Sequence, residues 1–301
     1  MGVFILNDFL WSPTYTAIPL TSVITNNRPA LMNFWNKYLL QKCINVFKWK
    51  MPKTWSENYF LYTLYITGFC SVLYYWKYGW IPQKCGLSGL NLYEEPSNIF
   101  ISNSYVWGVD RKIGDGCVLF KLNPDYTGVV DIVNYYSMRL SEMALTAYAN
   151  MQNTKISFLI GVDNNKEAEA VKVIVNQVLN GELAAIAKKD SIGEWDVFSQ
   201  NVKQNYIVSD LIIDMRNTLA DFNTMVGIPN ANTDKKERML KDEINSNNAE
   251  TRTLSEKWLS SFKETCEELN NIAGENLMSV DWSDSMKEGD GYVNSKSTKL
   301  E

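Results

Sequence analysis

Residues 227–248 read GIPNANTDKKERMLKDEINSNN and follow a long stretch of helical periodicity. The segment opens with Gly227 and Pro229, which are typical of a helix end. Between positions 234 and 243, basic and acidic side chains are equal in number. The bases are Lys235, Lys236, Arg238 and Lys241, and the acids are Asp234, Glu237, Asp242 and Glu243. Such a stretch is typical of a solvated loop or of a short helix that carries ion pairs.

Helical patterns lie on both sides of this segment. Upstream, residues 202–226 predict a helix about 35 Å long, and two further helices are predicted at 30–50 and 136–153. Downstream, Thr253 and Glu256 have the spacing of a capping box and predict that a helix opens there, within a helical region at 249–280. Residues 281–301 are polar and predict a mobile tail.

The remaining segments are less helical. Residues 51–135 contain short apolar runs separated by glycines and predict mostly β structure. Within 154–200 we expect a small α/β unit with strands at 156–162, 183–187 and 195–198 and a helix at 166–179. Residues 1–29 are apolar and interrupted by three prolines, which is typical of an extended arm. The fold class predicted is therefore α+β.

Composition excludes several kinds of chemistry. The chain has no histidine, so it cannot contain a Ser-His-Asp triad or a histidine-based zinc site. Its net charge of −5 argues against tight DNA binding by a single copy, because affinity grows with the number of phosphates that are neutralised. Five scattered cysteines without a C-x-x-C pair are typical of a reducing compartment.

An uncharged stretch, residues 58–76, is long enough to cross a bilayer. It is rich in Tyr and Thr and interrupted by Gly68, so two consecutive β segments explain it equally well. A membrane-anchored scaffold that uses 58–76 as its span is therefore an alternative interpretation.

Signals of catalysis are weak. No phosphate-cradling loop, dinucleotide fingerprint or nucleophile elbow occurs in the sequence. The acid pairs Glu94–Glu95 and Glu267–Glu268 are of the right type for acid–base or metal chemistry. Such pairs more commonly lie on the solvated surface and have no catalytic role. An enzyme that works through carboxylates and a metal is a third interpretation, and we predict neither enzymatic activity nor a cofactor.

The segment GIPNANTDKKERMLKDEINSNNAE resembles the one after the last channel helix in portal proteins (head–tail connectors, upper collars) of small short-tailed bacteriophages with protein-primed double-stranded DNA genomes. The resemblance continues through FKETCEELN at 262–270. It extends more weakly to CGLSG at 85–89, to GCVLF at 116–120 and to the α/β unit. The order of elements agrees from about residue 30 to residue 275.

The resemblance implies a portal-type subunit with three long stem helices, a β-rich wing, a small α/β clip and a C-terminal helix. An N-terminal arm would cover 1–29, a first stem or wing helix 30–50, the wing 51–135, a stem helix 136–153 and the clip 154–200. The long stem or channel helix would cover 201–228, a tunnel loop 229–248, the C-terminal helical region 249–280 and a mobile tail 281–301.

The resemblance also implies a function. The subunit would form a ring, in the family a dodecamer, at a capsid vertex, through which double-stranded DNA is packaged and ejected. The implied partners are the major capsid protein, a lower collar or tail protein and the packaging ATPase, and the implied location is the virion after assembly in the host cytoplasm. The implied channel residues are Lys235, Lys236, Arg238, Lys241, Lys203 and Arg216, and the implied tunnel-loop motif is Asn230, Asn232, Glu237, Asp242 and Glu243.

The N-terminal arm departs from this pattern. The family's arm is strongly basic and is associated with nucleic-acid contact at the packaging motor. Here Arg28 is the one base among residues 1–29. We therefore predict that the arm packs on a neighbouring subunit or on the capsid and does not bind RNA.

Overall fold

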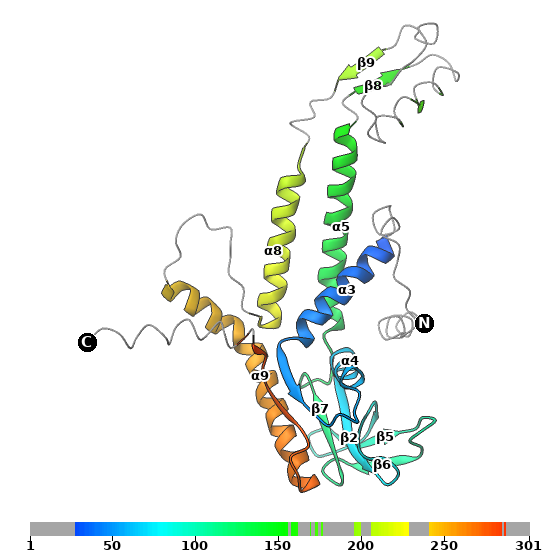
Figure 1. Cartoon of the computed structure of the whole chain (residues 1–301), viewed down its shortest axis with the longest axis vertical. Helices are drawn as coiled ribbons and strands as arrows, with labels where there is room; N and C mark the ends of the chain where they lie inside the picture. Colours follow the sequence, from blue (N-terminus) through cyan, green and yellow to red (C-terminus); the bar gives the residue numbers. More distant parts are fainter. Residues whose placement is uncertain are drawn as a thin grey trace, which may run out of the picture. The chain divides into compact units, whose positions relative to one another are not determined.

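The computed structural model describes residues 28–155, 158–161, 196–199, 206–228 and 241–284, together with positions 169, 172, 173, 176 and 286 (Figure 1). The chain divides into two compact units. Among the described residues, the first unit contains Asn33–Ser137 and those from Ala220 onward, and the second contains 28–32 and Met138–Leu219. The second unit is thus inserted into the first along the chain.

Helices and strands alternate irregularly, as expected for an α+β fold. The helices are α3 (Arg28–Ile44), α4 (Glu57–Thr67), α5 (Val130–Lys155), α8 (Val208–Val226) and α9 (Lys241–Ala273). The strands are β1 (Phe47–Lys50), β2 (Phe69–Tyr75), β3 (Gly79–Gln83), β4 (Gly86–Leu90), β5 (Pro96–Ile101), β6 (Val109–Lys112), β7 (Cys117–Lys121), β8 (Phe158–Gly161), β9 (Asp196–Ser199) and β10 (Ser279–Trp282).

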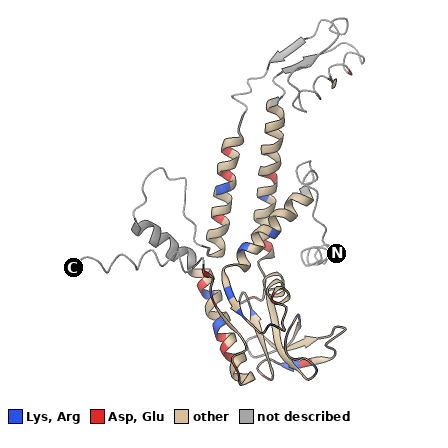
Figure 2. Cartoon of the chain, in the orientation of Figure 1, with Lys and Arg blue, Asp and Glu red and all other residues tan. Residues whose placement is uncertain are grey.

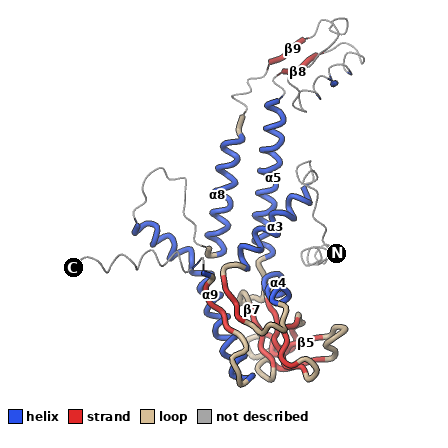
Figure 3. The backbone as a smooth tube through the Cα atoms, viewed as in Figure 1, coloured by secondary structure: helices blue, strands red, loops and turns tan. Residues whose placement is uncertain are grey.

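Three small sheets belong to the first unit (Figure 3). Their strand orders are β3-β2-β7, β4-β5-β6 and β1-β10, and all their neighbouring strands are antiparallel. Strand β10 pairs with β1 in the register Phe47↔Trp282 to Lys50↔Ser279. This pairing joins residues from the two ends of the described chain.

Residues 58–76 form a helix and a strand, which corrects the expectation of two β segments. Ser56 caps α4 by accepting a hydrogen bond from the backbone N–H of Tyr59, and Gly68 ends the helix in the left-handed region at φ 91°. Phe60, Leu61, Leu64 and Tyr65 are buried at helical spacing. Within the described part of the chain, no helix combines the length and apolar character that crossing a membrane requires.

The core of the first unit is aromatic. Phe60, Phe120 and Phe262 are fully buried, and the ring of Trp49 lies between 5.0 and 6.1 Å from each of theirs. These rings come from α4, β7, α9 and β1, so one cluster joins four elements. A second cluster joins Ile99 and Ile101 of β5 to Leu73 of β2 and Cys117 of β7. Burial of these aromatic and aliphatic side chains stabilises the unit.

In the second unit, α5 and α8 lie side by side (Figure 1). The backbone N–H of Ile207 donates to the Asn150 side chain at 3.1 Å, and Thr218 contacts the sulfur of Met143 at 3.8 Å. Strands β8 and β9 form an antiparallel pair; β8 lies within the strand expected at 156–162, and β9 overlaps the one expected at 195–198 but ends at Ser199. The expected helix at 166–179 falls largely, and the strand at 183–187 entirely, outside the described residues.

Three helix boundaries differ from the sequence predictions. Helix α5 begins at Val130, before the predicted 136, and α8 begins at Val208, after the predicted 202. Helix α9 begins at Lys241, so Thr253 lies inside the helix and residues 241–248 of the expected tunnel loop are helical. No proline or glycine interrupts 241–273, and Asp242 and Glu243 are favourable near a helix N-terminus.

All five cysteines are buried free thiols. Burial raises the pKa of Cys43 and of Cys266 to about 12, and it raises the pKa of Cys70, Cys85 and Cys117 as well. Because the thiolate is the reactive form, we expect Ellman's reagent to label none of the five thiols rapidly in the native protein and all of them in strong denaturant. Rapid stoichiometric labelling of the native chain would contradict this burial.

Candidate functional site

A buried contact between Gly227 and Ser255 of α9 joins the start of the charged segment, residues 227–248, to the helix that follows it. Helix α8 ends at Val226. The next residue, Gly227, has a φ of +82°, and its carbonyl oxygen accepts a hydrogen bond from the Ser255 hydroxyl at 2.7 Å. A Cβ on Gly227 would lie 2.7 Å from Ser255 Oγ and 2.8 Å from its backbone nitrogen. Only glycine therefore allows this contact, which brings together the residues on either side of 228–254.

Helix α9 is held firmly next to this contact. Trp258, 2% exposed, donates from its indole N–H to Asn123 Oδ1 at 3.0 Å. Its ring meets that of Tyr65 edge-on at 6.4 Å. One turn further along, Phe262 packs against Trp49. The α9 end of the segment is thus fixed to α4, β1 and the loop after β7.

The α8 end is fixed by a different set of residues. Phe222 is fully buried and contacts Tyr136 of α5, with ring centres 5.4 Å apart. Asn223 accepts a hydrogen bond from Lys42 Nζ at 3.1 Å. Burial lowers the pKa of Lys42. We name the Gly227–Ser255 contact, with Phe222 and Trp258 on its two sides, the segment anchor.

The structure places only some of the predicted channel residues. Arg216 is exposed on α8, and Lys241, Asp242 and Glu243 belong to the first turn of α9. Lys203, Lys235, Lys236 and Arg238 lie outside the described residues, as do Asn230, Asn232 and Glu237 of the motif. Of the charged segment, the structure therefore describes residues 227–228 and 241–248.

An acidic stripe on α8 was not recognised from the sequence. Asp210, Asp214 and Asp221 recur at helical spacing with Asn217 between them, and all four are exposed. Arg216 lies roughly 120° around the helix from this stripe. Figure 2 shows the acidic residues along α8 with a single basic position among them. The i, i+4, i+11 spacing of the aspartates is the signal that could have revealed the stripe.

A family model described as Phage Connector (GP10) matches residues 14–286. The match includes α8, the charged segment and α9. The chain belongs to the phage connector (GP10) family.

Solved structures similar to this connector come from assembled particles. One is the portal and tail of native bacteriophage P68, with 15% identity, a TM-score of 0.44, and coverage of 93% of this chain and 99% of that chain. Another is the virion of a native gene transfer agent particle, with 9% identity, a TM-score of 0.37, and coverage of 90% and 87%.

Several helices of the connector expose large apolar side chains. On α8 these are Ile212 and Ile213, each 43% exposed, and on α5 Met138, 53% exposed. Phe34 and Tyr38 of α3 are 52% and 42% exposed. Covering such side chains by another copy of the chain would be favourable, because apolar surface would leave water.

The two acid pairs of the connector lie at exposed positions. Glu94 and Glu95 follow Asn91, whose side-chain oxygen accepts hydrogen bonds from the backbone N–H groups of Tyr93 and Glu95. The pair therefore belongs to an Asn-capped turn. Glu267 and Glu268 are exposed on α9.

Proposed function

We propose that the chain is the portal subunit of a bacteriophage, which forms a ring-shaped channel at one vertex of the capsid. Double-stranded DNA passes through this channel during packaging and ejection, and tail components attach to it. The observation that carries the proposal is the family match over residues 14–286, which includes every described helix and strand. The protein acts as a structural conduit in the virion, and we propose no catalytic role for it.

The exposed apolar side chains support assembly into a ring. A closed ring of identical subunits uses head-to-tail contacts, in which one face of each copy meets a different face of the next. Side chains such as Ile212, Met138 and Phe34 lie on three helices and are suited to such contacts. We propose twelve copies, with the major capsid protein, a lower collar or tail protein and, during assembly, the packaging ATPase as partners.

The charges of α8 and of the segment support passage of DNA without tight binding. Duplex DNA presents one phosphate about every 1.7 Å, and each phosphate that is neutralised slows its release. An acidic stripe on a channel wall repels the duplex. The basic side chains at positions 235, 236, 238 and 241 make brief contacts with the phosphates, while Lys203 and Arg216 add sparse positive charge.

The first experiment is negative-stain electron microscopy of the purified protein, with native mass spectrometry to count subunits. We expect closed rings of one size, dissociated by neither moderate salt nor dilution, because apolar contacts hold them. A chain that stays monomeric under all assembly conditions would overturn the proposal.

Replacing Lys235 and Lys236 together by alanine tests the role of the segment. We expect rings to form normally, while particles assembled with the variant retain at least about fivefold less DNA, because two phosphate contacts per subunit are lost. The control is Lys53→Ala with Lys84→Ala, which removes the same charge from exposed positions of the first unit. Equal DNA retention by the two double variants would exclude the segment from the channel.

A further inference from the structure

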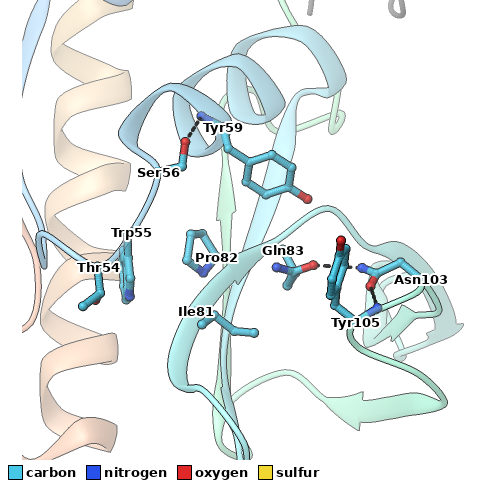
Figure 4. A pocket seen from close by; sticks show the side chains of 9 residues that line it. All are labelled: Thr54, Trp55, Ser56, Tyr59, Ile81, Pro82, Gln83, Asn103 and Tyr105. Atoms are coloured by element: carbon cyan, nitrogen blue, oxygen red, sulfur yellow. Dashed lines mark hydrogen bonds between the residues drawn. The ribbon is translucent and has the colours of Figure 1, made fainter. Parts of the chain in front are cut away.

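The first unit contains a pocket that the proposed channel does not use. It has a volume of about 400 Å³ and lies between the start of α4, strand β3 and the loop after β5. Apolar surface comes from Trp55, Tyr59, Ile81, Pro82 and Tyr105, and none of the lining residues is charged. Figure 4 shows Trp55 and Tyr105 on opposite sides, with Ile81 and Pro82 between them.

Hydrogen bonds fix the walls of this pocket. The Trp55 indole N–H donates to the Trp80 carbonyl oxygen at 2.7 Å, which holds one aromatic wall. The Asn103 amide donates to Gln83 Oε1 at 2.9 Å. The oxygen of the same amide accepts from the backbone N–H groups of Tyr105 and Val106 at 2.9 and 2.8 Å. Because the walls of the pocket are already ordered, a ligand binds there with only a small loss of the protein's conformational entropy.

Tyr105 remains open to solvent although its backbone is fixed. Its side chain is 76% exposed, and that of Trp107, two residues later, is 79% exposed. Aromatic side chains held at the mouth of a rigid pocket favour extended, proline-containing peptides, which dock between aromatic rings. The occupant that the pocket favours is therefore uncharged, apolar and extended.

The N-terminal arm has this chemistry. Residues 1–27 include Asp8 as their single charged side chain, and Phe9-Leu10-Trp11-Ser12-Pro13 combine aromatic, aliphatic and proline residues. The family match begins at residue 14, so these five residues lie outside it. Twenty-seven extended residues span up to about 90 Å. The arm is therefore long enough to reach another subunit of a ring.

We propose that residues 9–13 of one subunit occupy the Trp55–Tyr105 pocket of the neighbouring subunit. This inference rests on the proposed ring, in which each arm fills one pocket and each pocket receives one arm. Trp11 and Pro13 supply the apolar groups that meet Trp55, Pro82 and Tyr105. The absence of charge on both surfaces removes the cost of burying an unpaired ion.

Photocrosslinking in the full-length, assembled protein tests the proposal. Benzoylphenylalanine replaces Tyr105 in one variant and Trp107 in the matched control. We expect irradiation of the Tyr105 variant to give covalent dimers, with a yield at least fivefold above the control. Residues 1–27 contain no lysine or arginine, and trypsin does not cleave the bond between Arg28 and Pro29. Trypsin therefore releases the arm in one peptide that ends at Lys37, and mass spectrometry should find the adduct on it.

Each other outcome is decisive. Adducts within one chain, adducts on a different segment, or equal yields from the two positions would overturn the proposal. Replacing Trp11 and Pro13 by alanine should abolish the Tyr105 adduct, and persistence of that adduct would overturn the assignment of residues 9–13. Micrographs of the same samples test the portal function separately from the arm contact. Rings that form without the Tyr105 adduct would refute the arm contact and leave the proposed portal function intact.

Discussion

Replacing Gly227 by alanine is expected to lower the free energy of unfolding by about 3 kcal/mol, from left-handed strain and overpacking. The φ of +82° disfavours any Cβ, and the new methyl group would lie 2.8 Å from the backbone nitrogen of Ser255. Because the neighbour is backbone, a side-chain rotation cannot relieve the contact. Urea denaturation of the full chain measures the loss.

The matched control for this variant is Gly274→Ala. Gly274 ends α9 in a similar left-handed conformation, at φ +72°, but a Cβ there meets nothing within 4 Å. We expect this control to lose only the backbone strain, about 1 kcal/mol. Equal losses for the two variants would show that the Gly227–Ser255 contact does not constrain the chain. A larger loss at Gly227 identifies the segment anchor as a packed joint between α8 and α9.

Replacing Trp258 by alanine is expected to lower the free energy of unfolding by roughly 3–5 kcal/mol. The change removes a fully buried indole, its hydrogen bond to Asn123 and its contact with Tyr65. Trp258→Phe retains most of the apolar area and loses the hydrogen bond, so we expect a smaller effect, about 1–2 kcal/mol. Thermal and urea unfolding provide the measurement.

The control for Trp258→Ala removes an indole from the surface. Trp107 is 79% exposed, and Trp107→Ala should change the free energy of unfolding by at most about 0.5 kcal/mol. If Trp258→Ala were equally harmless, α9 would not be fixed to the first unit through this residue. The segment would then lack a firm attachment at its C-terminal end.

Local patterns in the sequence predicted much of the fold. The helical periodicity of α3, α5 and α8 was readable, as was the glycine signal for a helix end at 227, because these signals depend on neighbouring residues. The stretch at 58–76 was harder, because tyrosine and threonine suit strands while the Ser56 cap and the Gly68 stop favour a helix. Burial of Phe60 and Leu64 against the sheet decides in favour of the helix.

The candidate site was less predictable. The contact of Ser255 with Gly227 joins residues 28 positions apart, and nothing local distinguishes Ser255 from the other polar residues of α9. The true start of α9 was missed because a capping-box spacing at Thr253 also occurs by chance inside helices. The acidic stripe of α8 was readable from spacing alone, whereas the Trp55–Tyr105 pocket depends on elements that only the tertiary structure brings together.

The pairing of β1 with β10 has a consequence for synthesis of the protein. Strand β1 emerges from the ribosome long before its partner, Ser279–Trp282, because more than 200 residues separate the two strands. The first unit therefore cannot complete its β1-β10 sheet until the chain has been made as far as residue 282, and contacts so distant in sequence form slowly. Prematurely terminated chains that lack β10 would leave an unpaired edge at Phe47–Lys50. Such fragments should be poor building blocks, so that mainly chains that contain β10 enter an assembly.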